Sequence, residues 1–81
     1  MTIYVGNLNY KVSEQEVAVL FENYGTVESV KIIKDRETGK ARGFCFVEMP
    51  DAKEGAKAIQ SLHATEFLGR NLTVNEAKPR G

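Results

Sequence analysis

Cysteine and histidine are almost absent from this sequence of 81 residues, which contains one of each. Cys45 cannot form a disulfide within the chain, so we expect a reducing environment and a cytoplasmic protein. One cysteine and one histidine are also too few for a zinc site made only of Cys and His side chains. We therefore expect no metal and no cofactor, and we expect Cys45 and His63 to be structural residues.

Long apolar runs and an excess of either charge are also missing. No apolar run approaches the roughly 18 residues that a membrane span needs, so we expect no membrane partner. Strand-like residues from Thr2 onward leave no room for a secretory leader. Eleven basic residues balance eleven acidic ones, which argues mildly against a nucleic-acid partner because proteins that bind nucleic acids are usually basic.

The overall balance of charge hides two unlike regions. Residues 13–24 carry three glutamates and no basic residue, whereas residues 31–42 carry five basic residues against two acidic ones. The zero net charge is therefore an average over an acidic surface and a basic one. With 42% apolar and 27% charged residues, the composition is that of an ordinary globular domain.

The first part of the chain predicts a strand followed by a helix. β-Branched and aromatic residues closed by a glycine predict a strand over residues 2–6. Ser13 and Glu16 form a capping box that predicts a helix over about residues 14–23, and Gly25 predicts a left-handed stop. One face of this helix is apolar, with residues at helical spacing: Val17, Leu20, Phe21 and Tyr24.

The second part predicts two strands, another helix and a last strand. Residues 27–34 and 42–48 predict strands joined by a polar turn, and Asp51 predicts the cap of the second helix. Apolar residues repeat at helical spacing on this helix: Ala52, Ala56, Ile59 and Leu62. Residues 63–70 predict a turn region or a small hairpin, and residues 71–77 predict the fourth strand.

This order predicts the ferredoxin-like βαββαβ fold, an α+β sandwich in which two helices cover one face of a four-stranded antiparallel sheet. We expect one domain over residues 1–78 and a tail at 79–81. Both helices are amphipathic, so one side of each strand should face them. The side predicted to be buried comprises Ile3, Val5, Gly43, Cys45, Val47, Met49, Leu72 and Val74.

Three aromatic side chains fall on the opposite, open face of the predicted sheet. Phe44 and Phe46 share one side of the third strand, and Tyr4 faces the same way on the first. Polar residues surround them: Lys31, Arg42, Thr73 and Asn75. Exposing three rings forfeits roughly 1.5–3 kcal/mol each relative to burial, so such a patch usually marks a binding surface. Rings beside positive charge suit stacking on unpaired nucleobases.

The segment RGFCFVEM at residues 42–49 resembles the longer ribonucleoprotein motif of the RNA-recognition motif family. It departs from that motif at Cys45, where glycine or alanine is usual, and at Met49, where an aromatic residue is usual. The segment IYVGNL at residues 3–8 resembles the shorter motif of the same family. The resemblance covers the whole chain and extends to small single-domain RNA-binding proteins of bacteria, cyanobacteria included, and to plant glycine-rich RNA-binding proteins.

The resemblance implies a role for individual residues. Tyr4 and Phe44 would each stack under one base, and Phe46 would pack against the sugars between them, while Arg42 would pair with a phosphate. Base edges would be read at the end of the fourth strand by Asn75, Ala77, Lys78 and Arg80. The RNA backbone would follow three basic residues: Lys31, Arg36 and Lys40. The implied protein is a monomer without catalytic activity that binds single-stranded RNA, with single-stranded DNA left open.

Other interpretations compete with this one. The tail or residues 63–70 could simply cover the rings. A protein-interaction module could instead use the sheet aromatics or the acidic helix face to grip a partner. Small metal chaperones of this topology carry a Cys-x-x-Cys pair in the first loop, and small hydrolases of this topology carry an arginine in a phosphate-cradling first loop. The loop GNLNYKV at residues 6–12 has neither a cysteine nor an arginine, so these two alternatives, the metal chaperone and the small hydrolase, are rejected.

Overall fold

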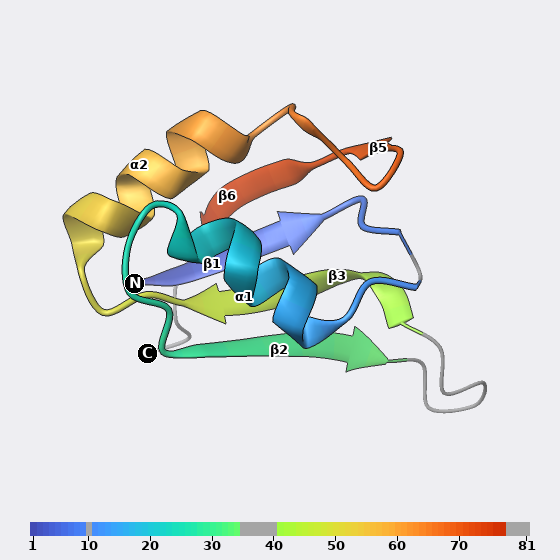
Figure 1. Ribbon diagram of the computed structural model, residues 1–81, viewed down its shortest axis with the longest axis horizontal. Helices are drawn as coiled ribbons and strands as arrows, with labels where there is room; N and C mark the ends of the chain where they lie inside the picture. The colour runs from blue at the N-terminus through green and yellow to red at the C-terminus, as the bar shows by residue number, and fades with distance from the viewer. Residues whose placement is uncertain (10, 35–40, 78–81) are drawn as a thin grey trace.

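The computed structural model describes residues 1–9, 11–34 and 41–77, without the side chains of residues 34, 41 and 42. Its elements in chain order are β1 (Thr2–Gly6), α1 (Glu14–Glu22), β2 (Ser29–Lys34), β3 (Ala41–Glu48), α2 (Ala52–Leu62), β4 (Glu66–Phe67), β5 (Arg70–Asn71) and β6 (Thr73–Ala77). Four strands form one antiparallel sheet in the order β2-β3-β1-β6. Both helices cover the same face of it (Figure 1), which confirms the predicted ferredoxin-like sandwich.

The predicted strand boundaries are correct to within two residues. The second strand starts at Ser29 instead of residue 27, and the last one starts at Thr73 instead of residue 71. The difference at the last strand arises because Asn71 pairs with Glu66 in the small β4–β5 hairpin. Among the described residues, no helix has both the length and the apolar character to cross a membrane.

The start of α1 follows the predicted capping box. The Ser13 hydroxyl accepts a hydrogen bond from the Glu16 N–H at 3.2 Å, and the Glu16 carboxylate accepts one from the Ser13 N–H at 3.3 Å. These two bonds satisfy N–H groups that a helix start leaves free. The helix then places Val17 and Phe21 fully inside the core, as its apolar face predicts.

The end of α1 differs from its prediction. Gly25 is not left-handed, because the positive-φ glycines among the described residues are Gly43 and Gly69. Asn23 caps the helix in a right-handed conformation, with φ −64. Gly25 is instead required for close packing, since a Cβ there would come within 2.6 Å of the Glu54 Cβ and would clash with its carboxyl group.

The buried face of α2 is also rotated from the predicted one. Ala52 and Ala56 were predicted on the buried side and are exposed. The residues that pack inward are Gly55, Ala58 and Leu62, with Ile59 partly buried. Gly55 belongs to this face because the Met1 thioether occupies the space that a Cβ at residue 55 would need. Small, weakly apolar residues occur on both sides of this helix, so the spacing of its alanines did not show which side is buried.

The core lies between the helices and the sheet, and it follows the predicted alternation. Its buried residues on the strands are Ile3, Val5, Cys45, Val47 and Val74, and Met49 and Leu72, which flank β3 and β6, are buried as well. Gly43 is only partly buried and has φ 82, a conformation that favours glycine. The pairing of β2 with β3 shifts register at this place, so the regular alternation of β3 holds from Cys45 onward.

Candidate nucleic-acid interface

Tyr4, Phe44 and Phe46 form a cluster on the open face of the sheet, which we call the aromatic platform. The ring centroid of Tyr4 lies 5.9 Å from that of Phe44 and 6.0 Å from that of Phe46, and the centroids of the two phenylalanine rings lie 6.1 Å apart. All three side chains are partly exposed. The Tyr4 and Phe44 planes are tilted by 33°, whereas Phe46 stands at 85° to Phe44. The structure thus confirms that the three rings come together.

The platform lies in the middle of a row that crosses all four strands. Lys31 of β2 is opposite Phe46, Phe46 is opposite Tyr4, and Tyr4 is opposite Asn75 of β6. Side chains of directly opposed residues share a face, with Cβ atoms about 4.5–5.5 Å apart. Lys31 and Asn75 are exposed and therefore flank the rings. A cation suited to a phosphate and an amide suited to a base edge thus lie on either side of a stacking surface.

Gly6 allows the Tyr4 ring to lie along the sheet. A Cβ at Gly6 would come 2.7 Å from the Tyr4 hydroxyl oxygen and 2.9 Å from a ring carbon. Any side chain at this position would therefore displace the ring. The sequence indicated Gly6 only as the end of a strand, because the position of a ring over its neighbour two residues away depends on its rotamer.

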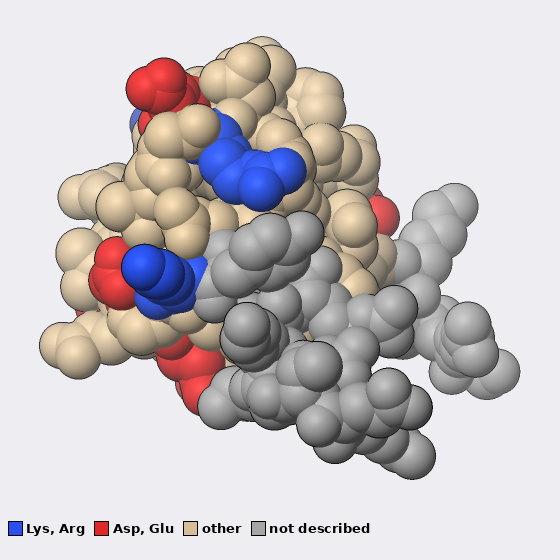
Figure 2. Space-filling model, turned by 90° about the vertical axis from the view of Figure 1, so that its right-hand side faces the viewer, with Lys and Arg blue, Asp and Glu red and all other residues tan. Residues whose placement is uncertain are grey.

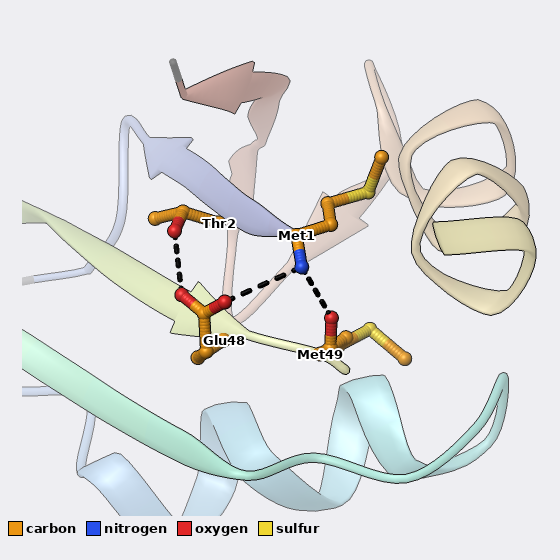
Figure 3. A network of polar contacts seen from close by, with 4 residues as sticks. All are labelled: Met1, Thr2, Glu48 and Met49. Carbon is orange, nitrogen blue, oxygen red and sulfur yellow. Dashed lines mark hydrogen bonds and ion pairs between the residues drawn. The ribbon is translucent and has the colours of Figure 1, made fainter. Parts of the chain in front are cut away.

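Thr2 and Glu48 form the next opposed pair along the same two strands (Figure 3). The Thr2 hydroxyl donates a hydrogen bond to Glu48 Oε2 at 2.5 Å, and the Met1 ammonium lies 3.3 Å from Oε1. The ammonium also donates to the Met49 carbonyl at 2.7 Å. The Thr2 hydroxyl, followed by the ammonium, holds the pKa of Glu48 below its usual range and outweighs partial burial, which raises it. Glu48 is therefore ionised at neutral pH.

Replacing Thr2 with valine should return the pKa of Glu48 toward its usual value, because the hydroxyl is the largest cause of the lowering. In the wild type, the lowered pKa contributes stability at pH above the ordinary carboxyl value, and this contribution is lost as the pH falls through the lowered folded value. A pH titration of the Glu48 carboxyl carbon by NMR checks this. Thr73→Val is the control, and an unchanged Glu48 titration in Thr2→Val would contradict the assignment.

Several predicted contacts lie outside the described residues and stay predictions. They are the Arg42 side chain and the residues Arg36, Lys40, Lys78 and Arg80. Ala77 is described, and it lies partly buried opposite Thr2 at the end of the sheet. Figure 2 looks at the end of the molecule that carries the β4–β5 hairpin, where the blue side chains of the described part stand apart from one another. On this side, the described basic residues form no continuous patch.

Two polar residues have structural roles that local patterns did not reveal. His63 Nδ1 accepts a hydrogen bond from the Val74 N–H at 3.1 Å, which ties the end of α2 to the edge strand β6. Asn7 has φ 58, and its side-chain Nδ2 donates to the Asn71 backbone carbonyl at 2.6 Å. Its side-chain Oδ1 accepts a hydrogen bond from the Arg70 guanidinium at 2.8 Å. These bonds join the first loop to the β4–β5 hairpin, so Asn7 has a structural role that requires no contact with RNA.

The β4–β5 hairpin lies on the helix side of the sheet. Phe67 packs against the core, and it lines a groove of about 380 Å³ together with Ser13 and with Val19 of α1. This placement argues against the alternative in which residues 63–70 cover the aromatic platform.

Cys45 is fully buried, as predicted. Burial raises the pKa of its thiol to about 12, and the negative charge of Glu14 adds to the effect. The thiol is therefore protonated at neutral pH and is not a nucleophile. Within the described ranges, no three His, Cys, Asp or Glu side chains are grouped in a way that could hold a metal ion.

The fold is a ferredoxin-like sandwich with an open, aromatic sheet face, and comparison with known proteins gives its family. The model of the RNA recognition motif family matches residues 3–73. The chain therefore belongs to the RNA recognition motif family. This confirms the resemblance that the two short motifs carried.

Individual relatives are similar in sequence to nearly the full length of this chain. RbpA of the cyanobacterium Nostoc sp. is 52% identical over 80 residues, which span 99% of this chain and 78% of RbpA. The chloroplast RNA-binding protein CP31B of Arabidopsis thaliana is 48% identical over 98% of this chain, which corresponds to 27% of CP31B. The crystal structure of the RNA-binding protein PG1 superposes with a TM-score of 0.95 at 52% identity, covering 100% of this chain and 98% of PG1.

Proposed function

We propose that this protein binds single-stranded RNA on the aromatic platform and has no catalytic activity. The observation that supports this most strongly is the row of Lys31, Phe46, Tyr4 and Asn75 on a sheet face that no helix covers. Stacking of an unpaired base on an aromatic side chain contributes about 1–3 kcal/mol, and basic side chains hold phosphates. Support also comes from relatives, because CP31B is named an RNA-binding protein and the related Rna15 domain was solved with bound RNA (GU).

Stacking also suggests how the protein acts. Every base has an aromatic face, so a stacking platform tolerates many sequences. A small monomeric domain of this kind suits post-transcriptional handling or chaperoning of many RNAs in the cytoplasm. The acidic helix α1 lies on the other face of the sheet, away from the platform (Figure 1), so its charge does not oppose the RNA there.

Titration of a fluorescent single-stranded RNA tests this function. Two stacked bases and a few phosphate contacts should give a Kd of about 1 µM, roughly −8 kcal/mol. The logarithm of the affinity should fall with the logarithm of the salt concentration by about 0.7 for each phosphate neutralised. Phe44→Ala should weaken binding by about tenfold. Equal binding by the folded variant and the wild type, or no binding by either, would contradict the proposal.

A further inference from the structure

The Thr2–Glu48 pair lies one step from the platform along the same strands. Thr2 precedes Tyr4 by two residues and Glu48 follows Phe46 by two, so all four side chains share the open face. Two residues along a strand span about 6.6–6.8 Å, which is close to the width of a nucleobase. A base that stacks on Tyr4 therefore brings one of its edges to the Thr2–Glu48 pair.

This pair presents hydrogen-bond acceptors to a ligand. The two oxygens of a carboxylate offer about four acceptor positions, and the Thr2 hydroxyl and the Met1 ammonium use two of them. The Glu48 side chain is 36% exposed, whereas Met1 is only 11% exposed. The Thr2 hydroxyl donates its proton to Glu48, so the hydroxyl also orients the carboxylate (Figure 3). What faces the solvent is a fixed and negatively charged acceptor.

The rest of this row adds no basic side chain. Ser29 lies opposite Glu48 on β2, and Ala77 lies opposite Thr2 on β6. A phosphate is repelled by the carboxylate, whereas the donor groups on a base edge are attracted by it. The backbone of a bound RNA is then better placed beside Lys31, in the row of the platform. The Thr2–Glu48 pair would then contact the edge of a base and not the RNA backbone.

We propose that the Thr2–Glu48 pair reads a base edge and selects guanine at one position of the bound RNA. Guanine carries two adjacent donors, its ring N–H and its exocyclic amino group, which match the two oxygens of a carboxylate. Adenine and cytosine offer one amino group, and uracil flanks its ring N–H with two carbonyl acceptors that the carboxylate repels. The inference rests on the proposed RNA binding and adds a preference at one position to a platform that accepts every base.

Three RNA heptamers test the inference. Each has uridine at its six outer positions, and the central nucleotide is guanosine, inosine or uridine. Inosine lacks only the exocyclic amino group of guanosine. The wild type should bind the guanosine heptamer about tenfold more tightly than the uridine heptamer, with inosine between them. Glu48→Gln keeps the shape but loses the charge and one acceptor, so its guanosine-to-uridine ratio should fall below about threefold.

Two further variants separate base reading from a loss of folding. Thr2→Val removes the hydroxyl that orients the carboxylate and should also lower the ratio, whereas Ser29→Ala in the same row should leave the ratio unchanged. Circular dichroism verifies that each variant is folded. Equal affinities of the wild type for the three heptamers, or a full guanosine preference in folded Glu48→Gln and Thr2→Val, would overturn the inference. Failure of the folded wild type to bind any heptamer would instead overturn the RNA-binding function itself.

Discussion

Replacing Tyr4 with alanine should weaken the binding of single-stranded RNA by about ten- to a hundredfold and leave the domain folded. The Tyr4 ring is partly exposed and lies beside both other rings of the platform. Tyr4→Ala therefore removes the central part of the surface on which a base would stack. Loss of one stacked base costs about 1–3 kcal/mol, and each 1.4 kcal/mol is a factor of ten in affinity. Fluorescence anisotropy of a labelled RNA measures the change.

Matched variants define what the Tyr4 result means. Tyr4→Phe keeps the ring and should bind nearly as well as the wild type. Val19→Ala removes an apolar side chain that is 56% exposed on α1, away from the platform, and should have no effect on RNA binding. Gly6→Ala keeps Tyr4 but displaces its ring, so it should weaken binding as well. Wild-type affinity in Tyr4→Ala would show that the RNA does not stack on this ring.

Replacing Phe21 with alanine should destabilise the protein by about 3–5 kcal/mol. Phe21 is the largest fully buried side chain of the described residues and lies between α1 and the sheet, so its truncation leaves a cavity among well-packed residues. Small domains are only marginally stable, with unfolding free energies of about 5–15 kcal/mol, and a domain of 81 residues buries less surface than larger ones. Urea denaturation followed by circular dichroism measures the loss.

Phe44→Ala is the matched control for Phe21→Ala, since both changes remove the same ring. Phe44 is partly exposed on the platform, so its truncation should cost much less stability and should weaken RNA binding instead. The two phenylalanines thus distinguish the core from the open sheet face. Destabilisation by Phe44→Ala as large as that by Phe21→Ala would mean that the platform is part of the core and is not an open surface.

The order of the elements and the composition of the open face were predictable from the sequence, because both depend on short-range periodicity. Alternation along a strand is fixed by the pleat, so the burial of Cys45 and Val47 assigns Phe44 and Phe46 to the other side. The capping box at Ser13 is likewise local. These signals lie within a few residues of one another and need no knowledge of the tertiary structure.

The wrong predictions concern contacts between distant segments. Gly25 lacks a side chain because Glu54 of α2 lies against it, and the Met1 side chain helps to decide which face of α2 is buried. Neither neighbour is visible in the local pattern. The small residues of α2 also allow two apolar stripes at helical spacing, so the choice between them depends on packing against the sheet.

The aromatic side chains of the candidate site were predictable from the sequence, but the hydrogen bonds between its polar side chains were not. Tyr4, Phe44 and Phe46 follow from alternation, but the hydrogen bond from Thr2 to Glu48 joins residues 46 positions apart and depends on the register of two strands. Alternation already places Glu48 on the same side as Phe46, but only the register of β1 against β3 brings it opposite Thr2. The acceptor pair beside the platform therefore became visible only with the strand pairing.

The most direct test of the central claim, that RNA binds to the open sheet face, is NMR chemical-shift mapping with a single-stranded RNA. The row across the four strands predicts the largest shifts at Lys31, Phe46, Tyr4 and Asn75, with little change along α1. Shifts confined to α1 and the groove beside Val19, with none on the aromatic platform, would contradict the account.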